Sequence, residues 1–339
     1  MRLVTFAVNS VERVGAEIEH AIVDLNLAYA KFLDDKGDGR AYENAALRIP
    51  NCMTIFLEGG APSIEAAREG LDYVKNTPNL KAPRGEKIVY RKGEVVLRVP
   101  LRPNKIMAVA GNSKGAVEKL PERERRPVMF WKGGRTTVIA SGDEIELNPE
   151  SLLTHVEVEL AVVIGMRARN VPAEKAYDYV AGYTILNDIS AEDLVRAFKR
   201  SDKSYGEMMI GKKLPTEPEQ FLKTGVTLTS WVENKNRDTF APTGPCIVTR
   251  DEILNPHDPP LRYESRVNGE LVQEGTSADL YFTVPEQIER FSRIMTLEPG
   301  DLISTGSVAT LPPTRVLKHN DVVEAKIEKI GTITNTCRA

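Results

Sequence analysis

The feature that most constrains the fold is a segment in which acidic and apolar side chains alternate before an uninterrupted apolar stretch. Residues 155–164 (HVEVELAVVI) place His155, Glu157 and Glu159 at alternate positions and end on apolar residues. Because successive side chains of a β-strand point to opposite faces, we expect these three to share one face. The apolar end predicts a strand that enters the interior, where like charges are costly unless a cation or hydrogen bonds compensate them. The competing interpretation is an edge strand with two solvated glutamates.

A third acidic residue follows where the next strand is expected to end. Asp188 lies between a candidate strand over residues 183–186 and residues 190–193 (SAED), which resemble a capping box at the start of a helix. Alone, such an aspartate is typical of a turn or a helix cap. Together with Glu157 and Glu159 it forms an all-oxygen set, which suits Mg²⁺, Mn²⁺ or Ca²⁺ better than Zn²⁺. We therefore predict a divalent-metal site formed by these three carboxylates.

The rest of the pattern predicts more strands than helices, several of them joined by hairpins. Asn268-Gly269 is typical of a two-residue hairpin turn. Helices are expected to begin at Ser63, as an N-cap, and near Pro172 and Pro285. Further strands are expected over residues 1–8, 128–131, 226–232 and 322–330, and residues 14–25 are expected to form a strand, a turn and a second strand. Such content favours an α+β fold with much antiparallel sheet over a doubly wound parallel sheet.

A polar, proline-containing stretch precedes a second apolar segment near residues 100–103. We place a domain boundary there, with a small N-terminal α+β domain over residues 1–102 and a larger domain over residues 103–339. Residues 200–224 follow the aspartate segment and precede Lys235. They are interpreted either as an insertion that shapes a lid or as a surface excursion.

Composition narrows the classes of partner and compartment. The net charge of −3 gives no basic excess for nucleic acid or an anionic membrane surface. The three cysteines are far apart and form no CxxC pair, which favours a reducing compartment. The first residues, MRLVTFAVNS, lack the apolar core of a signal peptide, and no apolar run approaches the roughly 20 residues of a membrane helix. We expect a cytoplasmic protein that binds neither nucleic acid nor membranes.

The order of several motifs resembles the fumarylacetoacetate hydrolase superfamily. HxExE followed by LAVVIG, then AGYTILNDISA, K-x-x-DTFAPTGP, VNGE and TLEPGDLISTG occur in that order from about residue 103 to the C-terminus. The resemblance implies a mixed, mainly antiparallel β-roll of the fumarylacetoacetate hydrolase type and a homodimer. It implies that Glu157, Glu159 and Asp188 bind Mg²⁺ or Mn²⁺.

The same resemblance implies roles for further residues. It places Lys235 near the metal and substrate as a catalytic residue, and Thr305 and Gly306 in contact with substrate oxygens. Thr276 matches a threonine near the site, where a strand-end hydroxyl is an equally good interpretation. Lys132 matches a lysine that follows an aromatic-rich strand and is predicted to bind substrate. His155 is predicted to orient the glutamates, although a structural histidine would fit equally well.

The resemblance implies a metal-dependent enzyme that forms an enolate from a small 2-oxo or β-diketo acid. Hydrolysis of a C–C bond, as with an acylpyruvate or a fumarylacetoacetate-like acid, is the first prediction. Hydrolytic members commonly carry GxNYxxHAxE, but this chain has Ala116 and Lys119 at the histidine and glutamate positions, and only Glu118 is nearby as a candidate base. A decarboxylase, isomerase or hydratase on the same metal site, or a binding protein that has lost catalysis, therefore stays as the alternative.

Overall fold

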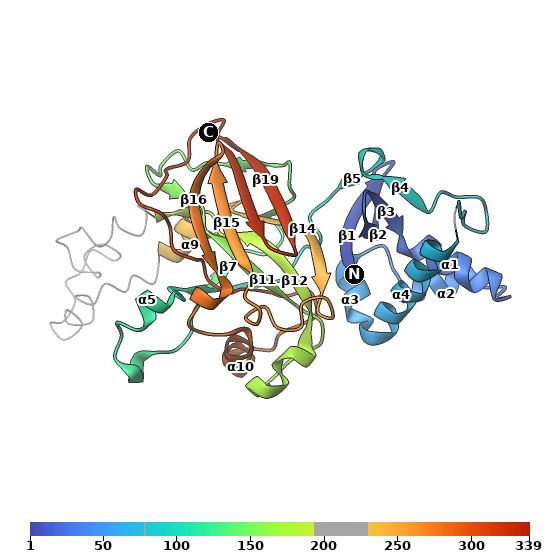
Figure 1. Ribbon diagram of the computed structural model, residues 1–339, viewed down its shortest axis with the longest axis horizontal. Helices are drawn as coiled ribbons and strands as arrows, with labels where there is room; N and C mark the ends of the chain where they lie inside the picture. The colour runs from blue at the N-terminus through green and yellow to red at the C-terminus, as the bar shows by residue number, and fades with distance from the viewer. Residues whose placement is uncertain (78, 193–229) are drawn as a thin grey trace, which may run out of the picture.

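The computed structural model describes residues 1–77, 79–192 and 230–339. Its main sheet has 12 strands among these residues, in the order β4-β3-β2-β1-β14-β12-β11-β17-β6-β7, with β5 paired to β1 and β8 to β14 (Figure 1). The strands of this sheet are β1 (Arg2–Val8), β2 (Val11–Ile18), β3 (Ala21–Asp24), β4 (Val89–Arg91), β5 (Val96–Leu97), β6 (Ile106–Ala110), β7 (Val128–Lys132), β8 (Val138–Ile139), β11 (Val158–Ile164), β12 (Val180–Asn187), β14 (Ala241–Thr249) and β17 (Leu302–Ser304). Within this sheet, the described pairs are antiparallel except β6–β17 and β8–β14, which are parallel.

A second, five-stranded sheet has the order β16-β15-β18-β19-β9. Its strands are β9 (Glu144–Glu146), β15 (Arg262–Val267), β16 (Glu270–Thr276), β18 (Val322–Ile327) and β19 (Gly331–Arg338). One buried cluster contains Val162 and Tyr183 of the main sheet together with Tyr263 and Ile327 of the second, so the two sheets pack face to face around a common core. The α+β, mainly antiparallel fold predicted from the sequence is confirmed.

The N-terminal helices pack against the first strands of the main sheet. They are α1 (Leu25–Asp35), α2 (Ala41–Arg48), α3 (Met53–Glu58) and α4 (Gly60–Asn76). Leu25, Phe56 and Leu71 share a buried cluster with Leu3 of β1. Figure 1 shows these elements beside the main body, and β1 pairs with β14, so the main sheet runs through both parts. The division at residue 102 stays a prediction.

Several expected helix boundaries are wrong. Helix α4 begins at Gly60, and Ser63 is buried inside it instead of capping it. The segment after Pro172 is a 3₁₀ helix, η3 (Ala173–Tyr179), instead of an α-helix. Helix α10 (Val284–Ile294) begins at its expected proline turn, where the hydroxyl of Thr283 and the carboxylate of Glu286 form the capping box.

The strand expected over residues 155–164 is divided in two. β10 (Thr154–His155) pairs with β13 (Ser190–Ala191), and β11 begins only at Val158. Between them the backbone N–H of Glu157 donates to the side-chain oxygen of Asn187 at 3.1 Å, instead of to a ladder carbonyl. Ser190 lies in β13, and Glu192, directly after that strand, is helical. The capping box expected over residues 190–193 includes Asp193, which lies outside the described residues, so it stays a prediction.

The strand expected over residues 226–232 is wrong in its described part, since Ser230–Lys235 form the helix α9. Residues 226–229 and the possible insertion at 200–224 lie outside the described residues. Helix α5 (Lys114–Val117) lies in the loop between β6 and β7.

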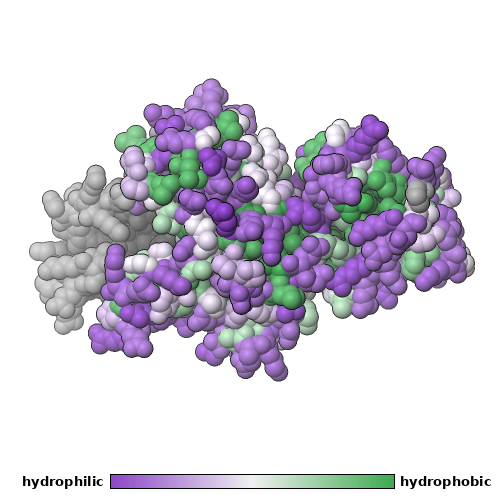
Figure 2. Space-filling view, viewed as in Figure 1, coloured by the Kyte–Doolittle hydropathy of each residue, from purple (hydrophilic) through white to green (hydrophobic). Residues whose placement is uncertain are grey.

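Figure 2 shows a mostly hydrophilic face with hydrophobic side chains gathered in small patches. Of the helices in the described ranges, none combines the length and the apolar character needed to span a membrane.

Candidate metal centre

Three carboxylates at the ends of two adjacent strands, β11 and β12, converge on one point. One oxygen each from Glu157, Glu159 and Asp188 lie within 4.8 Å of one another. Glu159 belongs to β11, and Asp188 directly follows β12, whose last residue, Asn187, pairs with Val158. The backbone N–H of Asp188 donates to the carbonyl of Glu157 at 2.8 Å, which fixes the two ligand segments side by side. Antiparallel pairing thus explains how residues about thirty positions apart share one site.

Two lysines, Lys132 and Lys235, form ion pairs with the carboxylate of Asp188. The ammonium of Lys132, which is 0% exposed, lies 2.5 Å from Oδ1 of Asp188. It also donates to the backbone carbonyls of Lys235 at 2.7 Å and Ile189 at 3.3 Å. Burial alone would raise the pKa of Asp188, but Lys132 and Lys235 outweigh it and keep that pKa below its usual value. Asp188 is therefore anionic and rigidly oriented.

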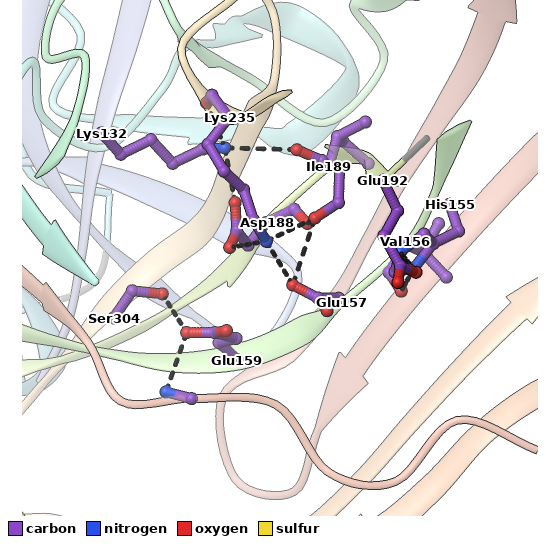
Figure 3. Close-up of polar contacts among 12 residues, drawn as sticks. Lys132, His155, Val156, Glu157, Glu159, Asp188, Ile189, Glu192, Lys235 and Ser304 are labelled. Atoms are coloured by element: carbon purple, nitrogen blue, oxygen red, sulfur yellow. Dashed lines mark hydrogen bonds and ion pairs between the residues drawn. The ribbon is translucent and has the colours of Figure 1, made fainter. Parts of the chain in front are cut away.

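Lys235, at the end of α9, bridges two of the carboxylates. Its Nζ lies 2.5 Å from Oε2 of Glu157 and 2.6 Å from Oδ2 of Asp188 (Figure 3). It also lies 5.2 Å from the ring centroid of Phe130. Burial would lower the pKa of Lys235, but the two carboxylates raise it above its ordinary value. The lysine supplies part of the positive charge that this acidic cluster requires.

Glu159 is buried and is the one candidate ligand of the three that forms no ion pair within the described residues. The hydroxyl of Ser304 donates to its Oε2 at 2.5 Å and the backbone N–H of Gly306 at 2.9 Å. Gly306 has a φ of 98°, and a side chain there would approach Cβ of Asn112 to 2.6 Å, so only glycine fits. Burial, followed by repulsion from Asp188 and Glu157, raises the pKa of Glu159 to about 8.

The donor set fits a hard divalent cation. All three side chains offer carboxylate oxygen, and, when all are ionised, three carboxylates against two ammonium groups leave a net charge of −1. A cation would relieve the repulsion that raises the pKa of Glu159. The cluster can therefore bind a metal ion through Glu157, Glu159 and Asp188.

The carboxylates open into a cavity of about 410 Å³. Its walls come from the β6–α5 loop, from β10, β13 and α9, and from the segment after Gly306. They include Gly111, Asn112, Ser113, Phe130, His155, Ser190, Glu192, Asn234, Lys235, Ser307, Val308 and Thr310. Its size suits a small-molecule ligand.

The predicted site residues divide into those inside and those outside this cavity. His155 lines it, but its Nε2 lies 3.3 Å from Glu192 and forms no hydrogen bond with the ligand glutamates within the described residues (Figure 3). Thr305 is buried behind the site, where its hydroxyl donates to the carbonyl of Leu160. Thr276 pairs with Asp279 outside the cavity lining, and Glu118, at the C-terminal end of α5, is exposed and does not line the cavity.

Lys132 contacts the carboxylate of Asp188 and Gly306 contacts that of Glu159, and neither residue lines the cavity. Sequence reasoning gave no role to Ser304 and Asn234. Ser304 directly precedes Thr305-Gly306, so the signal was a hydroxyl beside a recognised motif. Asn234 directly precedes Lys235 in a short helix, α9, whose first residues, 230–232, were expected to form a strand, so no signal for its position existed.

Metal binding should strengthen as the pH rises to about 8. In the metal-free protein Glu159 is mostly protonated below its pKa of about 8, and a cation must displace that proton. The apparent affinity should fall about tenfold per pH unit below that value and level off above it. Calorimetry of Mn²⁺ binding in buffers of different ionisation enthalpy should show about one proton released at pH 6.5 and almost none at pH 9. A pH-independent affinity, or the same proton release in Glu159→Gln, would contradict this assignment.

Ser304→Ala should weaken metal binding by about 10–100-fold, because it removes a hydroxyl that orients a ligand carboxylate. The measurement is the dissociation constant for Mn²⁺ at pH 8.5. The matched control is Ser292→Ala, another buried serine, whose Oγ accepts from the backbone N–H of Val171 far from the cavity. Equal affinities in both variants would show that the Ser304 contact has no influence on the centre.

Comparison with known proteins agrees with this architecture. The family model described as fumarylacetoacetate (FAA) hydrolase C-terminal matches residues 105–338. Oxaloacetate tautomerase YisK of Bacillus subtilis is 35% identical over 292 residues, covering 80% of this chain and 85% of that protein. The mitochondrial oxaloacetate tautomerase FAHD2A of Homo sapiens is 32% identical over 297 residues, covering 85% of this chain and 80% of that protein.

The fold is also shared with a solved structure. Maleylpyruvate hydrolase from Sphingobium sp. SYK-6, in complex with manganese(II) and pyruvate, aligns with a TM-score of 0.66 at 23% identity, covering 100% of this chain and 99% of that chain. The family match spans more than half of the sequence, and both curated relatives exceed 30% identity. The chain therefore belongs to the fumarylacetoacetate hydrolase superfamily.

Proposed function

We propose that the protein is a tautomerase that interconverts the keto and enol forms of a small 2-oxo acid with Mg²⁺ or Mn²⁺ at the carboxylate centre. The observation that carries this proposal is the pairing of the acidic cluster with the Lys235 ammonium, 2.5 and 2.6 Å from two ligands and at the cavity wall. A bound divalent ion polarises the keto oxygen and makes the adjacent C–H bonds more acidic. Lys235 would hold and deliver the proton that moves between substrate atoms.

Tautomerisation needs proton transfer but no activated water. The loop where hydrolytic members carry the histidine and glutamate has Ala116 and Lys119, both exposed and outside the cavity lining. Two relatives that cover most of the chain are named oxaloacetate tautomerases. This supports the isomerising alternative over the hydrolysis first predicted from the motifs.

Hydrolysis of a C–C bond remains a second candidate because of one observation. His155 and Glu192 lie 3.3 Å apart in the cavity wall, on the side of the cluster away from Lys132 (Figure 3). A histidine beside a carboxylate is the arrangement that activates water in many enzymes. An acylpyruvate substrate distinguishes the two functions, because only hydrolysis releases a free acid from it.

The test is a rate measurement with product identification. The metal-free protein, reloaded with Mg²⁺ or Mn²⁺, should accelerate the decay of enol-oxaloacetate absorbance without forming pyruvate and CO₂ and without cleaving an acylpyruvate. Chelation should remove the acceleration. Acid release from the acylpyruvate, or CO₂ release from oxaloacetate, at rates above the tautomerisation rate would replace this proposal with hydrolysis or decarboxylation.

We also propose that the protein works as a homodimer in the cytoplasm. The dimer follows the superfamily resemblance, and the compartment follows the three widely spaced free cysteines, which favour a reducing environment. Light scattering coupled to gel filtration tests the oligomeric state. A monomer at assay concentration would contradict the dimer.

A further inference from the structure

One buried amide in the cavity wall has a side-chain oxygen with no hydrogen-bond partner among the described residues. Asn234 is 4% exposed, and its Oδ1 is sequestered without a donor anywhere in residues 1–77, 79–192 and 230–339. Its side chain lines the cavity that contains the carboxylate centre. A buried acceptor without a donor costs free energy, so such a group calls for an explanation. A bound ligand that supplies the missing donor would provide one.

The other buried polar side chains of the cavity wall contrast with Asn234. Each has a hydrogen bond or an ion pair within the described residues: Asn112, His155, Glu159, Asp188, Ser190 and Lys235. Asn112, for example, donates to the carbonyls of Thr305 and Phe282 and accepts from the backbone N–H of Phe282. The amide of Asn112 thus shapes the protein, whereas the amide of Asn234 is available to a ligand.

Asn234 also has a suitable position relative to the reacting centre. It precedes Lys235 in α9, and neighbouring side chains of a helix diverge by about 100°. Lys235 extends to Glu157 and Asp188, so Asn234 faces a different part of the same cavity. A ligand whose head lies at the carboxylates would present its tail to Asn234.

We infer that Asn234 is a specificity-determining residue that binds a hydroxyl group on the tail of a monocarboxylic 2-oxo acid. The inference rests on the proposed function for the position of the 2-oxo acid head. A hydroxyl donates to Oδ1 and accepts from the amide nitrogen, so it satisfies both ends of the side chain. A carboxylate tail only accepts hydrogen bonds at neutral pH and would leave Oδ1 without a donor.

The charges of the centre favour the same class of substrate. With a divalent ion bound, the three ionised carboxylates and the ammonium groups of Lys132 and Lys235 carry a net charge of +1. One substrate carboxylate neutralises this charge. A second carboxylate on the tail would leave a net negative charge in a buried site, which is unfavourable.

Three four-carbon ligands test the inference on the full-length protein with Mg²⁺: 4-hydroxy-2-oxobutanoate, 2-oxobutanoate and oxaloacetate. Calorimetry should show the hydroxylated ligand binding about tenfold more tightly than either other ligand. Asn234→Leu should remove this preference while binding 2-oxobutanoate within about twofold of the wild type. Exchange of C3 protons into D₂O, followed by NMR, should show the same order in kcat/KM.

Two further variants separate ligand recognition from a structural role. Asn234→Asp keeps an acceptor oxygen and should retain the preference for the hydroxylated ligand over oxaloacetate. Asn236→Leu, the same change outside the cavity lining, should leave all three affinities within about twofold. In the metal-free protein, Asn234→Leu should not lower the Tm, because it removes an unpaired buried amide.

The outcomes distinguish this inference from the proposed function. Equal wild-type affinities for the three ligands, or an unchanged preference in Asn234→Leu, would overturn the role of Asn234. A marked loss of Tm in Asn234→Leu would show a structural residue instead. Binding with the expected preference but without proton exchange would keep the inference and contradict only the tautomerase proposal.

Discussion

Replacing Asp188 with alanine is expected to abolish metal-dependent activity and to lower the free energy of unfolding by about 3–5 kcal/mol. The loss of activity follows because one of three ligand carboxylates disappears. The loss of stability follows because Lys132, with an exposure of 0%, and Lys235 would both lose the same anionic partner. Removing one member of a buried ion pair leaves an uncompensated charge, which is far more costly than removing an exposed pair.

Denaturant unfolding of the metal-free protein measures the stability, and calorimetry with Mn²⁺ measures the ligand role. The matched control is Asp301→Ala, since Asp301 is also fully buried and pairs with Lys105, but lies outside the cavity. It should destabilise the fold yet keep metal affinity within about twofold. If Asp188→Ala retained Mn²⁺ binding or full turnover, the metal centre would be misplaced.

The double substitution Asp188→Ala with Lys132→Met should recover part of the lost stability. It removes the buried cation together with its partner and fills the space with an apolar chain, which is often neutral for stability. Activity should not return, because the ligand oxygen is still missing. This separates the electrostatic cost of the unpaired lysine from the loss of the metal ligand.

Local patterns were sufficient to predict the sheet-rich fold and the ligand segments, but not the conformation between them. Alternation over residues 155–164 predicted one strand, yet the chain leaves the ladder at Glu157. The cause is partly distant: the side chain of Gln273 on β16 accepts from the backbone N–H of Val158 at 2.9 Å. A partner more than a hundred residues away leaves no trace in the periodicity of the segment itself.

The role of Lys132 illustrates the same limit for the site. Motif order placed it near the centre and predicted contact with substrate, while the structure puts its ammonium against Asp188 and outside the cavity lining. The sequence did carry a signal for this position. Phe130 and Lys132 are two residues apart in a strand, so their side chains share one face, and both are buried. A lysine on an apolar face needs a buried anion, and that requirement points to Asp188 instead of a ligand.

Replacing Lys235 with methionine should lower kcat by about 10²–10⁴-fold without weakening metal binding. The ammonium lies 2.5 Å from Glu157 and 2.6 Å from Asp188, so it competes with a cation for the same oxygens. Methionine has a similar length and no charge, which makes the net charge of the carboxylate cluster one unit more negative. Mn²⁺ affinity at pH 8.5 should therefore stay equal or increase, while proton transfer loses its donor.

The measurements are kcat for enol-oxaloacetate at saturating Mn²⁺ and the dissociation constant of the ion. Lys105→Met is the matched control, since Lys105 is a largely buried lysine paired with Asp301 outside the cavity, and its kcat should change less than about threefold. Unchanged kcat in Lys235→Met would remove this lysine from the mechanism. A parallel loss of activity and metal affinity would assign it to building the centre, because a proton donor that is not a ligand can be removed without releasing the ion.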